Sequence, residues 1–155
     1  MPGRQSKIQF ETMTIEQCRQ HCCNSDIQDV LEIAVAAAMQ AGAILLDRYE
    51  KPHHIQHKVS IDIVTEADLA SEQLILDVLR QNMPGTKILS EESFSSYSKI
   101  PDEPVWIIDP LDGTTNFAHN FPWFSVSIAF HDKGKSQAGV IYSPIQNELF
   151  CTTLD

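Results

Sequence analysis

Basic residues are scarce in this sequence. The 155 residues include 11 lysines and arginines against 21 aspartates and glutamates, which gives a formal net charge of −10. Phosphate backbones are held mainly by clustered lysine and arginine, so this balance argues against a nucleic acid as partner. The acidic excess is compatible with a protein that binds cations.

Long apolar runs are also missing. No run reaches the length of about 20 apolar residues that crosses a membrane, and the N-terminus lacks a signal-peptide pattern. We therefore expect no membrane as partner. The sequence also contains no internal repeat and no low-complexity segment.

Cysteine is limited to Cys18, Cys22, Cys23 and Cys151. Four cysteines, three of them clustered near the start, do not resemble a secreted disulfide framework in a chain of this size. A reducing cytoplasm is therefore the expected location. The segment CRQHCC places His21 among cysteines, but adjacent cysteines are poorly spaced for zinc, so we favour an ordinary helix or tail.

The length indicates one domain of ordinary size, preceded by a weakly patterned N-terminal extension over residues 1–26. Ser25 and Gln28 fit a capping box that opens a long helix over about residues 28–49, where apolar residues recur at helical spacing. A second helix is expected to begin at Thr65, and the letters MPG at 83–85 end it.

Short strands dominate the remainder. A weak alternation before the second helix indicates a strand or hairpin, and TKIL at 86–89 and VWII at 105–108 read as strands. Three further strands are predicted at 124–131, 136–143 and 148–153. Helices followed by adjacent strands predict an α+β fold, with helices layered on one face of a mostly antiparallel sheet.

The segment VWIIDPLDGTTNF raises a chemical question, because a wholly apolar run ends in Asp109 and Asp112. Like charges so close together repel unless a cation compensates. The letters DPLDG alone fit an ordinary β-turn. The strand context favours a metal site, since we expect Pro110 to end the ladder and to leave both carboxylates and the Leu111 carbonyl at one point. Such hard oxygen ligands suit Mg²⁺, with Mn²⁺ possible.

The residues after this carboxylate pair suit an anion. Gly113 permits close backbone approach, and residues 114–117 can open a short helix whose N–H groups point at a phosphate beside the metals. The segment therefore predicts metal ligands and a phosphate cradle within a few residues of each other.

The letters WIIDPLDGTTNFAHNFPWFSVSIAF resemble the signature of the inositol monophosphatase family, which comprises magnesium-dependent, lithium-sensitive sugar-phosphate phosphatases. DIVTEAD at 62–68 and SEES at 90–93 match two upstream motifs of that family in the right order. The resemblance covers roughly residues 27–153. It implies the N-terminal half of a sugar-phosphatase-like αβαβα fold, so that residues 27–155 form its metal-binding catalytic portion.

The resemblance also implies roles for individual residues. The implied metal ligands are Glu91, Asp109, Leu111 through its carbonyl, and Asp112. The implied catalytic residues are Asp68 and Thr114, which would orient and activate the attacking water, together with Glu91. The implied phosphate contacts are Gly113, Thr114 and Thr115.

Some assignments stay open at this point. Asp68 also fits a cap of the second helix, and Glu92 is the alternative ligand if the register differs by one residue. Lys58 is a loosely spaced candidate for a basic residue near the site. Ser90 stands where the family usually has glycine, which affects loop geometry and leaves ligand chemistry unchanged.

The function that the resemblance implies is Mg²⁺-dependent hydrolysis of a phosphate monoester by metal-activated water, with two or more metal ions. Inositol monophosphate is the expected substrate, and a small phosphorylated sugar or polyol is the expected partner class. The alternatives are a phosphatase for a nucleotide or sugar bisphosphate, or a non-catalytic metal-binding or association module. The family's polypeptide is considerably longer, and its further metal-ligating aspartate has no counterpart here. We expect the chain alone to be inactive, and we expect a homodimer.

Overall fold

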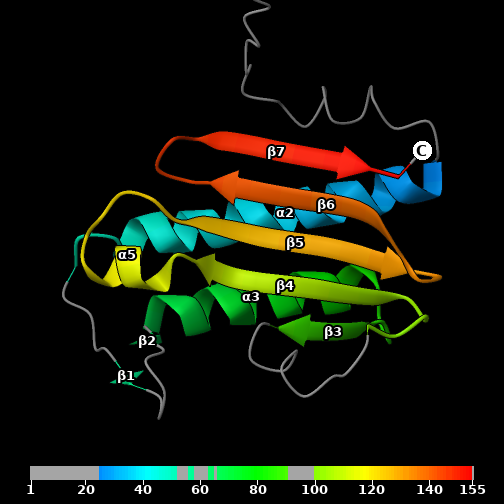
Figure 1. Cartoon of the computed structure of the whole chain (residues 1–155), viewed down its shortest axis with the longest axis horizontal. Coiled ribbons are helices and arrows are strands. Elements are labelled where there is room, and N and C mark those ends of the chain that lie inside the picture. Colours follow the sequence, from blue (N-terminus) through cyan, green and yellow to red (C-terminus); the bar gives the residue numbers. More distant parts are fainter. Residues whose placement is uncertain (1–24, 52–55, 58–62, 65, 91–99, 155) are drawn as a thin grey trace, which may run out of the picture.

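The structure is a computed structural model that describes residues 25–51, 56–57, 63–64, 66–90 and 100–154. The elements are named in Figure 1. Their bounds are α2 Ser25–Arg48, β1 Gln56–His57, β2 Ile63–Val64, α3 Glu66–Asn82, β3 Lys87–Ser90, β4 Val105–Asp112, α5 Thr114–Ala118, β5 Ser125–Asp132, β6 Lys135–Ser143 and β7 Glu148–Thr153.

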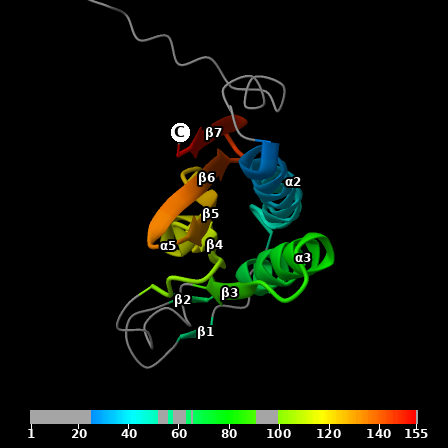
Figure 2. The same cartoon turned by 90° about the vertical axis from the view of Figure 1, so that its right-hand side faces the viewer.

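Two layers make up this part of the chain. Strands β3 to β7 form a five-stranded sheet in sequence order, in which only the β3–β4 pair is parallel. Figure 2 shows α2 and α3 together on one side of this sheet. The expected α+β fold, with helices on a mostly antiparallel sheet, is confirmed.

Small residues on the buried face of helix α2 allow it to pack closely against the sheet. Its buried positions include four alanines and Gly42. A Cβ placed on Gly42 would lie 2.5 Å from the Tyr142 ring of β6. The absence of a side chain at this position therefore lets the helix approach the sheet closely. Burial raises the pKa of Tyr142, whose hydroxyl donates to the Asn147 side chain.

The start of α2 differs from the predicted capping box. The helix begins at Ser25, whose hydroxyl bonds the neighbouring Asp26 carboxylate, while the Gln28 amide donates to Glu32 one turn later. Neither side chain caps the backbone in the predicted way. Acidic Asp26 in the first turn still suits the positive end of the helix dipole.

By length and composition, α2 is also the one described helix that could cross a membrane. Its apolar face has a different use here, because half of the apolar window is buried inside the protein. A core helix of this kind passes the same test, so the sequence-based expectation of no membrane partner remains a prediction.

Helix α3 buries a single stripe at intervals of four residues: Ala67, Ser71, Ile75 and Leu79. Arg48, at the end of α2, donates to the Glu66 carbonyl at the start of α3, with a distance of 2.8 Å. The predicted start at Thr65 lies outside the described residues. The end at Asn82, just before Pro84, agrees with the MPG signal.

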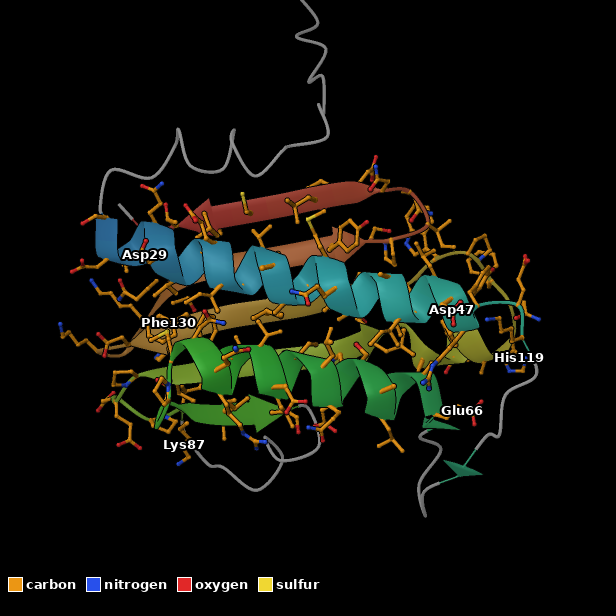
Figure 3. All side chains as sticks on the ribbon, turned by 180° about the vertical axis from the view of Figure 1, so that it is seen from behind. Asp29, Asp47, Glu66, Lys87, His119 and Phe130 are labelled. Atoms are coloured by element: carbon orange, nitrogen blue, oxygen red, sulfur yellow. The ribbon has the colours of Figure 1, made fainter. Side chains whose placement is uncertain are left out.

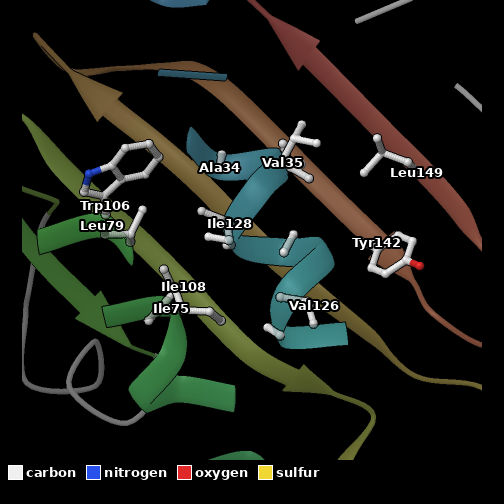
Figure 4. Close-up of a cluster of buried hydrophobic side chains, with 14 of the residues drawn as sticks. Ala34, Val35, Ile75, Leu79, Trp106, Ile108, Val126, Ile128, Tyr142 and Leu149 are labelled. Atoms are coloured by element: carbon white, nitrogen blue, oxygen red, sulfur yellow. The ribbon is translucent and has the colours of Figure 1, made fainter. Parts of the chain in front are cut away.

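The core lies between the helices and the sheet (Figure 4). Trp106 and Ile108 of β4 face Ile75 and Leu79 of α3 in this view. Trp106 is fully buried, and its ring packs against Phe130 at a centroid distance of 4.8 Å. The burial of apolar side chains such as these is the main stabilising contribution to the folding of a domain of this kind.

The last strand carries a feature that the sequence did not predict. Cys151 of β7 is disulfide-bonded and partly buried against the core. The other three cysteines of the sequence lie outside the described residues. A single bond of this kind is not a secreted disulfide framework, and the location of the protein stays a prediction.

Candidate metal centre

The end of α2, the start of α3 and the segment after α5 lie at one end of the described molecule. The view from behind in Figure 3 shows Asp47 near the end of α2, Glu66 at the start of α3 and His119 after α5 at the same end. Lys87 and Phe130 lie at the other end. Strand β4 ends near α5, so Asp112 belongs to the first group.

Strand β4 does not stop at Pro110 as predicted. It continues to Asp112, and its register with β5 shifts between the Asp109–Ser127 pair and the Asp112–Ser125 pair. Three steps along β4 therefore match two along β5, which is a β-bulge. Pro110 lacks an N–H and interrupts the ladder locally, while the strand resumes beyond it. We call residues 109–112 the bulge below.

Hydrogen bonds fix each part of the bulge. The Leu111 N–H donates to Asp109 Oδ1 at 3.2 Å, and the Thr114 hydroxyl donates to the Leu111 carbonyl at 2.9 Å. Asp112 Oδ2 accepts a hydrogen bond from the Ser125 hydroxyl at 3.4 Å. Asp109 is partly buried and Asp112 is exposed. The sequence predicted Asp109 at a strand end and Asp112 at the start of the following turn, whereas the structure has both residues within β4, on either side of the register shift.

Gly113 occupies a backbone conformation that suits glycine, with φ of 90°. A Cβ at this position would lie 3.0 Å from the Trp123 carbonyl oxygen. That carbonyl also accepts a hydrogen bond from the Asn116 amide at 2.7 Å. Gly113 therefore lies close to the loop after α5, and the predicted short helix is present as Thr114–Ala118. Contact of Gly113, Thr114 and Thr115 with a phosphate stays a prediction.

An aromatic cluster of Tyr49, Phe117 and Phe124 packs α5 against the end of α2. Tyr49 packs against Phe117 and Phe124 at centroid distances of 5.8 and 5.3 Å, and its hydroxyl donates to the Asn120 carbonyl. Burial, with a smaller contribution from the charge of Glu50, raises the pKa of Tyr49. The hydrogen bond of its hydroxyl connects the loop after α5 to the residue that follows α2.

His119 and Trp123 were predicted to be packing or loop residues. Both lie in the segment between α5 and β5, and both are exposed. Trp123 has 66% of its surface accessible, so its side chain contributes little to the core. They are loop residues by this criterion.

Helix α3 brings a further carboxylate to the same end of the molecule. Asp68 lies in its first turn and is partly buried. One turn later, the buried Ser71 hydroxyl donates to the Pro110 carbonyl of the bulge at 2.7 Å. This contact between α3 and the bulge was not predicted, because a serine in an apolar helical stripe carries no recognisable signal in the sequence.

Glu91 lies outside the described residues, as do the alternative ligand Glu92 and the basic candidate Lys58. The neighbouring geometry still bears on Glu91. Strand β3 runs parallel to β4 and ends at Ser90, which pairs with Ile108, the residue before Asp109. The chain therefore leaves β3 beside the first residue of the bulge.

The donor set of the bulge fits a hard divalent cation. It consists of two carboxylates and a backbone carbonyl, which are the oxygen ligands that Mg²⁺ selects. Within the described ranges, no group of three histidine, cysteine or acidic residues comes together, and Asp112 takes part in no ion pair. A cation at Asp112 would therefore meet no competing lysine or arginine among these residues.

Comparisons with known proteins bear on this arrangement. The sequence profile of the inositol monophosphatase family matches residues 26–155. Inositol monophosphatase 3 of Solanum lycopersicum is 43% identical over 129 residues, which are 82% of this chain and 48% of that protein. Nus factor SuhB of Pasteurella multocida is 46% identical over 123 residues, which are 78% of this chain and 46% of that protein.

A solved structure agrees with these sequence matches. The extragenic suppressor protein SuhB of Bartonella henselae gives a TM-score of 0.71 at 39% identity, over 80% of this chain and 48% of that one. The chain thus spans about half the length of the relatives it matches.

Proposed function

Because the chain belongs to the inositol monophosphatase family, we propose that it supplies the carboxylate centre of a Mg²⁺-dependent phosphatase that hydrolyses inositol monophosphate. The observation that carries this proposal is the bulge of β4. It sets the carboxylates of Asp109 and Asp112 and the carbonyl of Leu111 within four consecutive residues of one fixed segment. Two adjacent negative charges at this position are stabilised when a cation is bound between them.

The proposed ligands are Asp109, Asp112 and the Leu111 carbonyl, with Glu91 as the expected contribution from the end of β3. A bound Mg²⁺ would neutralise charge on the phosphate and activate water for attack. A carbonyl oxygen has two lone pairs, so the bond from Thr114 leaves Leu111 able to face a cation.

The hydrogen bond of Thr114 also defines what its side chain offers to water. Its single hydroxyl proton is donated to the Leu111 carbonyl. Its oxygen is therefore left as an acceptor, which can hold an attacking water by accepting one of that water's protons. Asp68 would accept the other proton and act as the base.

The phosphate group would lie over the start of α5. The backbone N–H groups of Gly113, Thr114 and Thr115 are the proposed donors, since the first N–H groups of a helix have no partner within it. Gly113, with its positive φ, is the single residue between the end of β4 at Asp112 and the start of α5 at Thr114, which supports this proposal.

The test is phosphate release from inositol 1-phosphate in the presence of Mg²⁺. It compares this chain with a longer version that carries the remaining half of a relative. We expect the longer version to release phosphate and lithium to inhibit that release. We expect little or no phosphate release from this chain alone. We expect the rate of this chain to be low because the substrate would be incompletely positioned and the transition state incompletely stabilised by metal. Loss of one electrostatic element alone commonly lowers the rate about 10²–10³-fold.

A nucleoside bisphosphate and a sugar bisphosphate, assayed in parallel, discriminate the alternative substrate classes. Preference for either would replace inositol monophosphate as substrate and keep the phosphatase assignment. A longer version that releases no phosphate from any of the three, although it is folded and binds Mg²⁺, would contradict the proposed enzyme activity.

A further inference from the structure

The polar side chain of Ser71 is unusual for its surroundings. Ser71 is fully buried in α3, where its neighbours along the stripe are Ala67, Ile75 and Leu79. Serine is a poorer helix former than alanine, and a buried hydroxyl is unfavourable without a partner. A role outside the helix therefore has to account for this residue.

The partner is the Pro110 carbonyl, 2.7 Å away. Serine in a helix often bonds the carbonyl four residues earlier, but the one hydroxyl proton of Ser71 is used across the interface. Pro110 itself is buried, and it lies where the β4–β5 register shifts. Ser71 thus satisfies a buried carbonyl within the bulge.

That carbonyl belongs to the peptide unit between Pro110 and Leu111. The next group along the chain is the Leu111 N–H, which donates to Asp109. The Leu111 carbonyl is held in turn by Thr114. The orientation of this one peptide unit therefore affects a carboxylate on one side and a carbonyl on the other.

We propose that Ser71 is a positioning residue for the metal ligands of the bulge. Its hydroxyl fixes the Pro110–Leu111 peptide and so aims the carboxylate of Asp109 and the carbonyl of Leu111. The hydrogen bond from Ser71 to Pro110 also connects α3 to the bulge. Asp68 lies one turn before Ser71 on the same helix, so this bond also positions Asp68 relative to the bulge. This inference rests on the proposed function for the identity of the ion.

The variants for the test are Ser71→Ala, which removes the hydroxyl, and Ser71→Cys, which keeps a weak donor of similar shape. Ile75→Val is the matched control, because Ile75 is equally buried one turn further along the same stripe. Each variant is measured in the full 155-residue chain for its melting temperature, its Mg²⁺ affinity by calorimetry and its amide hydrogen exchange.

For Ser71→Ala we expect Mg²⁺ affinity to fall about 10–100-fold, as is typical when a group that orients a ligand is lost. Ser71→Cys should recover part of this loss. Without Mg²⁺, the amides of Leu111, Asp112 and Gly113 should exchange faster in Ser71→Ala. Ile75→Val should lower the melting temperature and leave both affinity and these amides unchanged.

The two readouts separate failure of this inference from failure of the proposed function. If the parent chain binds Mg²⁺ and Ser71→Ala binds it equally well, the positioning role is wrong. If the parent binds no Mg²⁺, the metal site itself is wrong, and the exchange rates still decide whether Ser71 holds the bulge. Unchanged exchange at Leu111 to Gly113 would then overturn the inference.

Discussion

The side chains around the bulge leave Asp109 little freedom. Its carboxylate accepts a hydrogen bond from the Leu111 N–H two residues later, which restrains the orientation of the side chain. An amide at this position would keep a similar shape and lose the charge. Asp109 is therefore the residue at which charge and geometry are most easily separated.

We predict that Asp109→Asn weakens Mg²⁺ binding strongly, on the order of 10²-fold or more, because a charged ligand is replaced by a neutral one. Calorimetry on the parent chain and the variant measures this. Asp77→Asn on the exposed face of α3 is the control, since it removes the same charge far from the bulge. Equal affinity of parent and Asp109→Asn would remove the metal site.

At Gly113 the backbone itself is the constraint. We predict that Gly113→Ala lowers the free energy of unfolding by about 1–3 kcal/mol, from strain at positive φ together with the contact to the Trp123 carbonyl. Gly85→Ala is the matched control, because Gly85 has a similar φ of 82° with open space around it. Urea unfolding of both variants gives the difference due to the contact. A difference of zero would contradict the close approach.

Among the elements, α2 is the one with a purely structural role in our interpretation. Its last turn is joined to α3 by Arg48, whose side chain donates to the α3 backbone. Its buried residues pack against the sheet and α3. The helix therefore sets the position of α3 and α5 without contributing a ligand.

We predict that Leu45→Ala lowers the free energy of unfolding by about 2–5 kcal/mol, since Leu45 is fully buried and truncation leaves a cavity. Leu46→Ala is the control, because its side chain is 41% exposed and its loss should change stability by about 0.5 kcal/mol or less. Thermal or urea unfolding measures both. A longer, active version that lost activity with Leu45→Ala and kept its stability would contradict the structural role.

The elements also differ in how well the sequence predicts them. Both ends of each of the strands β5, β6 and β7 were predicted to within one residue, because alternation and turn residues are local signals. The bulge was missed, since proline in a strand normally indicates its end. The buried Pro110 carbonyl of the bulge is satisfied by Ser71, which is far away in the sequence, and no local pattern reveals such a partner.

The same distinction applies to the candidate site. Asp109, Asp112 and Gly113 belong to one contiguous motif, so the sequence alone predicts that they are neighbours along the chain. The contribution of Ser125 to Asp112 depends on the register of two strands, which periodicity alone does not determine.

For the whole molecule, the disulfide of Cys151 is a covalent link on β7, the last strand of the described sheet. We predict that reduction lowers the melting temperature by roughly 4–16 °C, because a disulfide is worth about 2–4 kcal/mol and each kcal/mol shifts the melting temperature of a domain of this size by about 2–4 °C. Calorimetry with and without a phosphine reductant measures this shift. Cys151→Ser is the control, which should melt at one temperature in both conditions.

Peptide mapping of the unreduced protein identifies the bonded pair. A peptide containing Cys151 should be linked to one that contains Cys18, Cys22 or Cys23. Four free thiols in a protein purified without reductant would show that the bond does not form.

The parallel pairing of β3 with β4 has a consequence for the order of folding. Strands β5, β6 and β7 are joined by tight turns at Lys133–Gly134 and around Asn147, so their contacts close short loops. Strand β4 is joined to its two neighbours by longer segments, residues 91–104 on one side and 113–124 on the other. Closing longer loops is slower and costs more entropy. We therefore expect the three-stranded meander to form early, and the strand that carries the carboxylates to dock onto it late.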